Sequence, residues 1–234
     1  MLAILKREFK SYFATPIGYI VLAIYFFFLG FYFRYYYSYG VPDIQDIIIG
    51  SMSMVVVFTI PILTMRLMSE ERKQKIDQAL LTAPVKLSAI VLGKFFAAFS
   101  LFALCFAPTV IFEIIIKTKV EVSLFVYIYA LVGIFLLGAA LIAIGLFISS
   151  LTESTVIAAI LTLVINILIL LMSGFSSLVK TEWIANILNK LAFINASQSF
   201  AEQQFSIPNI VYFLSIIVIF LFLSVRSLEK RRWA

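Results

Sequence analysis

The sequence has 234 residues, of which 63% are hydrophobic and 13% charged, and its mean hydropathy is +1.10. This composition excludes an ordinary soluble domain, and several uncharged runs reach the length of about twenty residues that a helix needs to cross a bilayer. The net charge is +6, but nucleic-acid binding needs a basic face on a soluble fold, which this composition does not provide. We therefore predict an all-α integral membrane protein with six transmembrane helices, arranged as one domain over residues 1–234.

The chain has few of the residues that bind metals or carry out redox chemistry. It contains no histidine and one cysteine, Cys105, which lies in an apolar run and has no second cysteine with which to form an intrachain disulfide. Zinc and haem sites depend mainly on these two residue types. We expect no metal site and no cofactor bound by the chain.

Residues 1–13 have the pattern of an amphipathic helix. One face carries Leu2, Leu5, Phe9 and Phe13, and another carries Lys6, Arg7 and Lys10. A basic start also fits a signal peptide, but the following apolar run is long and lacks a small-residue cleavage site. We favour a retained helix within residues 1–15 that lies along the membrane surface.

The first two spans are predicted at about residues 17–33 and 47–65. A tyrosine cluster at the far end of the first span is typical of an interfacial aromatic belt (Tyr32, Tyr35, Tyr36, Tyr37 and Tyr39). Pro61 lies near the end of the second span, where it favours a kink.

The stretch from Ser69 to Ala83 is polar and predicts a short helix between two spans. Ser69 is a candidate N-cap, and Glu70 and Glu71 follow in the first turn, where the helix dipole favours negative charge. An apolar stripe then recurs at helical spacing (Ile76, Ala79, Leu80 and Ala83), and Pro84 ends the helix. Such a stripe is buried either against the lipid surface or against a soluble partner.

Three further spans are predicted at about residues 95–116, 126–150 and 156–178. The third carries Glu113, which is either a functional intramembrane acid or an interfacial partner of Lys117. The fourth is rich in small residues, which favour close helix packing. The fifth contains Asn166, which indicates an interhelical hydrogen bond or, alternatively, part of a substrate path.

Residues 180–205 predict one or two short helices at the membrane surface, and the sixth span covers about residues 207–225. With six spans and the N-terminus in the cytoplasm, thirteen of the eighteen cations fall inside (Lys6, Arg7, Lys10, Arg66, Arg72, Lys73, Lys75, Lys86, Lys94, Arg226, Lys230, Arg231 and Arg232). Cytoplasmic loops carry an excess of Lys and Arg. Both termini and the stretch at 69–83 are therefore predicted to be cytoplasmic.

The chain lacks the residues of its own ATPase or of a hydrolase. Gly93-Lys94 has neither the upstream glycine nor the following Ser or Thr of a phosphate-binding loop, and no HExxH or GxSxG motif occurs. We therefore expect no enzyme activity. A secondary transporter would be expected to carry more titratable groups near the midplane than Glu113 and Asn166.

Four blocks, in order along nearly the whole chain, resemble the ABC-2 type permease family. They are KREFKSYFATPIGY at residues 6–19, PILTMRLMSEERKQKIDQALLTAPV followed by LGK within residues 61–94, ISSLTESTVIAA at 148–159, and IVYFLSIIVIFLFLSVRSLEKRRW at the end. Within that family, the chain looks most like the gliding-motility-associated (GldF-like) permease subunit.

The resemblance implies an architecture and partners. Residues 1–15 would form an elbow helix, 69–83 a cytoplasmic coupling helix, and 180–205 extracellular re-entrant helices before the last span. A separate cytoplasmic ATPase subunit would carry ATP and Mg²⁺, and a second permease subunit would complete a dimer in the membrane lipid. The protein would lie in the bacterial cytoplasmic (inner) membrane, and it would export its substrate. Alternatively, the chain would be a scaffold without substrate flux.

The resemblance also assigns roles to residues. Coupling to the ATPase would involve charges that orient the dock, apolar residues that bury against it, and a second contact at the turn after the fourth span (Glu70, Glu71 and Arg72; Ile76, Leu80 and Leu81; Glu153). Spans 2 and 5 would line the path, which makes Asn166 a candidate translocation residue. Glu113 in the third span is a second candidate, because it is an acid within the membrane.

Overall fold

A computed structural model describes residues 1–40, 44–75, 85–118, 123–178, 193–201 and 206–232. Within these residues all regular structure is helical. The helices are α1 (Leu2–Ala14), α2 (Pro16–Ser38), the π-helical turn η1 (Asp46–Ser51), α3 (Met52–Thr64), α4 (Ser69–Lys73), α6 (Leu87–Cys105), α7 (Pro108–Lys117), α8 (Leu124–Leu151), α9 (Thr155–Leu178), α11 (Phe193–Ala201) and α12 (Ile207–Arg232).

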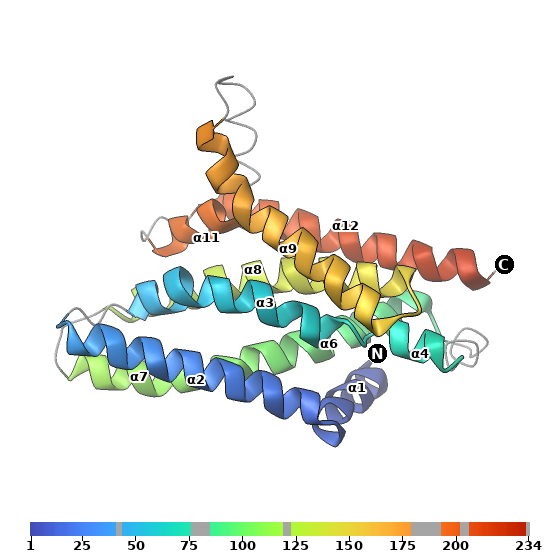
Figure 1. The fold of residues 1–234 in the computed structure, drawn as a ribbon, viewed down its shortest axis with the longest axis horizontal. Helices are drawn as coiled ribbons and strands as arrows, with labels where there is room; N and C mark the ends of the chain where they lie inside the picture. Colours follow the sequence, from blue (N-terminus) through green and yellow to red (C-terminus); the bar gives the residue numbers. More distant parts are fainter. Residues whose placement is uncertain (41–43, 76–84, 119–122, 179–192, 202–205, 233–234) are drawn as a thin grey trace.

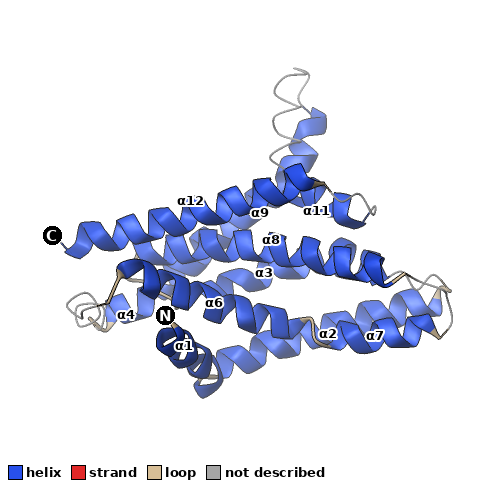
Figure 2. Ribbon diagram, turned by 180° about the vertical axis from the view of Figure 1, so that it is seen from behind, coloured by secondary structure: helices blue, strands red, loops and turns tan. Residues whose placement is uncertain are grey.

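Six helical stretches are long and apolar enough to cross a membrane, which confirms the all-α fold with six candidate spans. They are Pro16–Ser38, Asp46–Lys73, Leu87–Lys117, Leu124–Leu151, Thr155–Met172 and Ile207–Arg231. Figures 1 and 2 show the long helices side by side, with α1, α4 and the end of α12 at the same end of the bundle. An even number of crossings places the two ends of the chain together in this way.

The centre of the bundle is formed by α3 and α8. In the second and fourth candidate spans 72% of the most apolar window is buried, whereas in the fifth and sixth only 17% is. In Figure 1, α9 and α12 lie on one side of this centre and α2 and α7 on the other. The exposed side chains of the outer helices are mostly large and apolar, as expected for surfaces that face lipid.

Helix α8 approaches its neighbours closely through glycines. A methyl group added at Gly138 would lie 2.2 Å from the ring of Phe102 on α6, and one at Gly145 would lie 2.3 Å from Oγ1 of Thr64 on α3. The Phe102 ring is itself buried among Tyr25, Phe106 and Phe135. Small residues in the fourth span therefore serve close packing, as their abundance in the sequence predicted.

The third span begins earlier than predicted. Helix α6 starts at Leu87 rather than near residue 95, so that Lys94 lies inside the helix and is completely buried. Ion pairs to two carboxylates allow the apolar helix to continue through a lysine. Pro108 then divides the span, because it begins α7 after a two-residue turn. The sixth span is longer than predicted, since α12 continues past residue 225 to Arg232.

The helix predicted from Ser69 to Ala83 is interrupted. Helix α4 ends at Lys73, and Lys75 takes a positive φ of 58°, a conformation that an α-helix does not contain. Residues 76–84 lie outside the described part of the chain, as do the predicted contact residues Ile76, Leu80 and Leu81. Of the predicted helical region 180–205, the structure describes α11.

Candidate functional site

Helix α4 lies at the end of the bundle, where α1, the start of α6 and the turn between α8 and α9 come together. Polar side chains from these elements form a junction around it, which we call the α4 junction (Arg7, Glu8, Arg66, Glu70, Glu71, Arg72, Lys94, Ser149 and Glu153). Each of its charged residues takes part in an ion pair within the chain.

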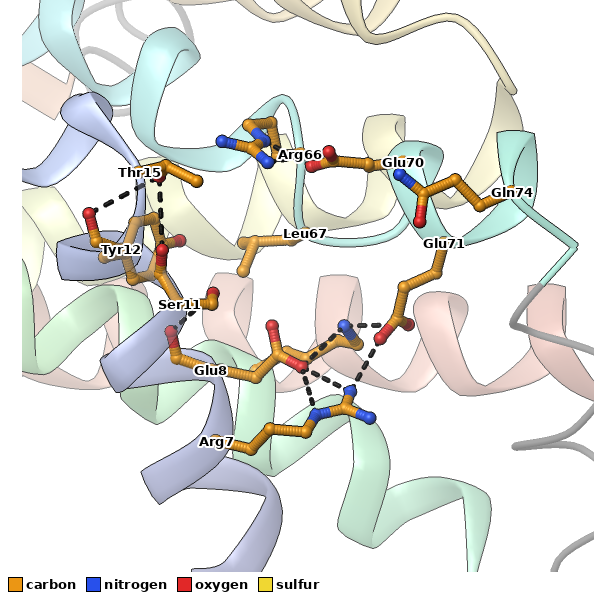
Figure 3. Close-up of a pocket in the computed structure, with 11 residues that line it drawn as sticks. Arg7, Glu8, Ser11, Tyr12, Thr15, Arg66, Leu67, Glu70, Glu71 and Gln74 are labelled. Atoms are coloured by element: carbon orange, nitrogen blue, oxygen red, sulfur yellow. Dashed lines mark hydrogen bonds and ion pairs between the residues drawn. The ribbon is translucent and has the colours of Figure 1, made fainter.

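The buried part of the junction is an ion cluster around Lys94. Its Nζ lies 2.9 Å from Oε2 of Glu71 on α4 and 3.2 Å from Oε1 of Glu8 on α1. Arg7 bridges the same carboxylates, with Nη2 at 2.5 Å from Glu8 and 2.6 Å from Glu71. Figure 3 shows Arg7 and Glu8 from one helix meeting Glu71 from the other. Two cations and two carboxylates thus join three separate segments.

The ion cluster makes a buried lysine tolerable. The Lys94 side chain is 1% exposed, and taking an ammonium group out of water is costly unless carboxylates surround it. Arg7 is half exposed and connects the cluster to solvent. Hydrogen bonding to Glu8, together with the negative charge of Glu71, raises the pKa of Arg7, so this guanidinium stays charged.

A cavity of about 280 Å³ lies between the ion cluster and the end of the second span. Its wall includes Tyr12, whose hydroxyl donates a hydrogen bond of 2.9 Å to the carbonyl of Leu63. Burial raises the pKa of this phenol, which keeps it protonated and able to donate. On the far wall Arg66 pairs with Glu70, one turn away. The cavity therefore has balanced charge, with three cations and three carboxylates.

On its other side, α4 is attached to the turn between α8 and α9. The Nε of Arg72 lies 2.8 Å from Oε1 of Glu153, and its Nη1 donates a hydrogen bond of 3.0 Å to the carbonyl of Leu151. That carbonyl belongs to the last residue of α8, where helical carbonyls lack partners and a cation is favourable.

Ser149 on α8 caps the start of α4 from outside the helix. Its hydroxyl accepts hydrogen bonds from the backbone N–H groups of Met68 and Ser69, each at 3.1 Å, and donates to the carbonyl of Met65. The prediction that Ser69 caps this helix is wrong. The N-cap position is Met68, and the Ser69 hydroxyl donates a hydrogen bond to the carbonyl of Met65, one turn earlier.

The structure brings together four of the predicted coupling residues: Glu70, Glu71, Arg72 and Glu153. Sequence analysis missed Glu8, Lys94 and Ser149, which hold α4 in place. The signal for Lys94 was its position inside an apolar run, well past Lys86. The signal for Glu8 was a carboxylate on the otherwise basic face of residues 1–13.

Asn166 is a structural partner of Pro61. Because a proline has no N–H, the carbonyl of Val57, four residues earlier in α3, lacks its helical donor. The Nδ2 of Asn166 on α9 donates to this carbonyl at 3.2 Å. This bond confirms the predicted interhelical hydrogen bond. The Asn166 side chain is completely buried.

Glu113 lies elsewhere. Its side chain is 4% exposed, and the nearest cation is Nζ of Lys117, at 3.9 Å. One turn earlier, Thr109 makes a hydrogen bond with Tyr127 of α8. Figures 1 and 2 place α7, which carries Glu113, and α9, which carries Asn166, on different sides of α3 and α8. The two predicted path residues do not form one site.

Six apolar spans, with a polar junction at one end of the bundle, define a multi-pass membrane protein. The ABC-2 type transporter family model matches residues 1–195, which include α1 to α9 and the α4 junction. The chain belongs to this family of membrane subunits, and it is accordingly a permease subunit of an ABC transporter. No curated protein matches the sequence.

Proposed function

We propose that this permease exports a substrate by alternating access and that a separate cytoplasmic ATPase subunit drives it through α4. The observation that supports this proposal is the connectivity of α4. A helix of five residues is joined by ion pairs to α1, to α6 and to the turn before α9, and by hydrogen bonds to α8.

Force applied to α4 would have two routes into the membrane. Glu71 would move α1 and α6 together through Arg7 and Lys94. Arg72 would move the α8–α9 turn through Glu153. In the first route the Lys94 pair is buried and therefore stiff. In the second route the Glu153 side chain is 63% exposed, so its ion pair is weak, about 0–1 kcal/mol.

The connectivity also changes the expected roles of the predicted contact residues. Glu70, Glu71 and Arg72 are held by partners within the chain, so we assign them to transmission rather than to the dock. Docking on the ATPase is left to the apolar residues Ile76, Leu80 and Leu81. On this proposal ATP and Mg²⁺ are bound by the partner, and a second permease subunit completes the pathway in a bacterial inner membrane.

The gliding-motility-associated subgroup is part of this proposal only through the sequence resemblance. It bears on the cargo rather than on the mechanism. A scaffold that moves without substrate flux would use the same α4 junction.

The test is to purify the chain in detergent from its native membrane and to measure the co-purifying ATPase. We expect Leu80→Asp to lose the ATPase subunit. Arg72→Glu should keep the subunit but reduce substrate-stimulated ATP hydrolysis several-fold, and adding Glu153→Arg should restore part of it by reversing the pair. Lys10→Glu, an exposed charge change on α1, is the matched control and should have no effect.

Three outcomes would contradict parts of this proposal. Retention of the ATPase by Leu80→Asp places the dock elsewhere. A normal response in Arg72→Glu removes the Glu153 route. Absence of any co-purifying ATPase removes the ABC mechanism and makes Glu113 the first candidate for a self-contained transporter.

A further inference from the structure

A second cavity lies where α4, the end of α8 and the end of α12 meet. Its volume is about 400 Å³, and it opens broadly to the outside. Four of its lining residues are cations (Arg72, Arg226, Lys230 and Arg231), and the rest are Phe147, Leu151, Leu223 and Ser227. Among the described residues, no carboxylate lines it.

Two of the cations that line this cavity form ion pairs with carboxylates outside its lining. Arg72 pairs with Glu153, and Arg226 pairs with Glu229 at 2.7 Å. The cavity beside the ion cluster differs, because its described lining holds three carboxylates as well as three cations.

The apolar wall of the cavity continues along the bundle. Leu151 and Leu223 are exposed at its edge, and Phe147 packs against Phe220 with ring centroids 5.7 Å apart. Arg226 lies over the ring of Phe222, at 5.0 Å from its centroid. Arg226 therefore lies directly against an apolar surface.

The position along α12 fits the membrane interface. The apolar run of α12 ends at Val225, and Arg226 begins the basic segment. Basic pockets at the ends of spans, next to apolar surface, are suited to acidic lipid headgroups, whose phosphates need cations while their chains need a hydrophobic wall.

We propose that this cavity binds an anionic phospholipid. Arg226, Lys230 and Arg231 hold its phosphate, and its acyl chains lie against Leu151 and Leu223. Because Arg72 lines the same cavity, the phosphate also approaches the ion pair that holds α4 to the α8–α9 turn. Lipid at this position therefore contacts the second transmission route.

The test uses the full chain purified in an uncharged detergent. Phosphatidylglycerol or phosphatidylcholine with the same dioleoyl chains is added, and retained lipid is counted by native mass spectrometry alongside the midpoint of thermal unfolding. We expect wild type to bind phosphatidylglycerol more tightly and to be stabilised by it. Arg226→Gln with Lys230→Gln should weaken that binding by about tenfold or more.

Two control variants accompany this pair. Lys6→Gln with Lys10→Gln removes the same charge from α1, at the same end of the bundle, and should bind phosphatidylglycerol as wild type does. Arg226→Lys with Lys230→Arg preserves the charge and should also bind. If the glutamine pair does not fold, Lys230→Gln alone is measured and should still weaken binding.

Four results would overturn the proposal. Unchanged phosphatidylglycerol binding in the glutamine variants would remove the site, and equal stabilisation by phosphatidylcholine would reduce it to general lipid solvation. Equal stabilisation by glycerol 3-phosphate would assign the cavity to a soluble phosphate. Loss of the ATPase subunit with phosphatidylglycerol binding unchanged would assign the cations to a protein surface instead. Only the last of these results involves the ATPase subunit, so the lipid measurements are independent of the proposed ATPase mechanism.

Discussion

At the scale of single residues, the side chains that organise the junction are charges withdrawn from water. Lys94 is held between Glu8 and Glu71, which come from segments far apart in the sequence. The residue type and its apolar surroundings were visible in the sequence. The partners were not, because they depend on α1 folding back against α6.

Replacing Lys94 by Met should destabilise the protein by about 3 kcal/mol, because Glu8 and Glu71 lose their buried cation. The measurement is the free energy of unfolding in mixed micelles at neutral pH. Adding Glu8→Gln and Glu71→Gln to this variant should recover part of the loss, since no carboxylates are then left to compensate.

Lys10→Met is the control for this series, because Lys10 is exposed on the same helix. Its effect should be small. A loss of stability equal to that of Lys94→Met would mean that the buried ion cluster contributes nothing specific.

At the scale of elements, the sequence predicted the spans well and the polar elements between them poorly. Long apolar runs specify membrane helices almost regardless of tertiary contacts, and the predicted fourth, fifth and sixth spans agree closely with α8, α9 and the apolar part of α12. The predicted length of α4 was wrong, because the helical periodicity of the sequence continues past Lys75 whereas the helix ends at Lys73. The capping of α4 by Ser149 requires a contact with α8, which no local pattern contains.

The link between α3 and α9 is the element contact that can be measured most directly. Asn166→Leu should cost about 1 kcal/mol in wild type, in the range of interhelical hydrogen bonds in membranes. In a Pro61→Ala background the new N–H can bond the Val57 carbonyl within α3, so the same substitution should cost less. Unfolding free energies of the four proteins give the coupling between these positions. Additive costs would show that Asn166 does not serve the carbonyl left free by Pro61.

At the scale of the whole molecule, the predicted orientation puts α1, α4 and the end of α12 in the cytoplasm. The chain's one cysteine, Cys105, is buried and gives a silent background for labelling. We expect Lys10→Cys to react with a membrane-impermeant maleimide only in opened cells. Thr118→Cys, exposed at the other end, should react in intact cells. The reverse pattern would invert the topology and place the α4 junction outside, away from any cytoplasmic ATPase.

The ion cluster also bears on how the protein is made. Glu8 and Glu71 both precede Lys94 in the chain, so both carboxylates have left the ribosome before the lysine emerges. An apolar segment with a lysine inside it enters a bilayer less readily than one without. Because Glu8 and Glu71 have already been synthesised, they can pair with Lys94 as α6 enters the bilayer. Without residues 1–14, synthesis should yield chains in which this segment fails to integrate, even though the segment itself is unchanged.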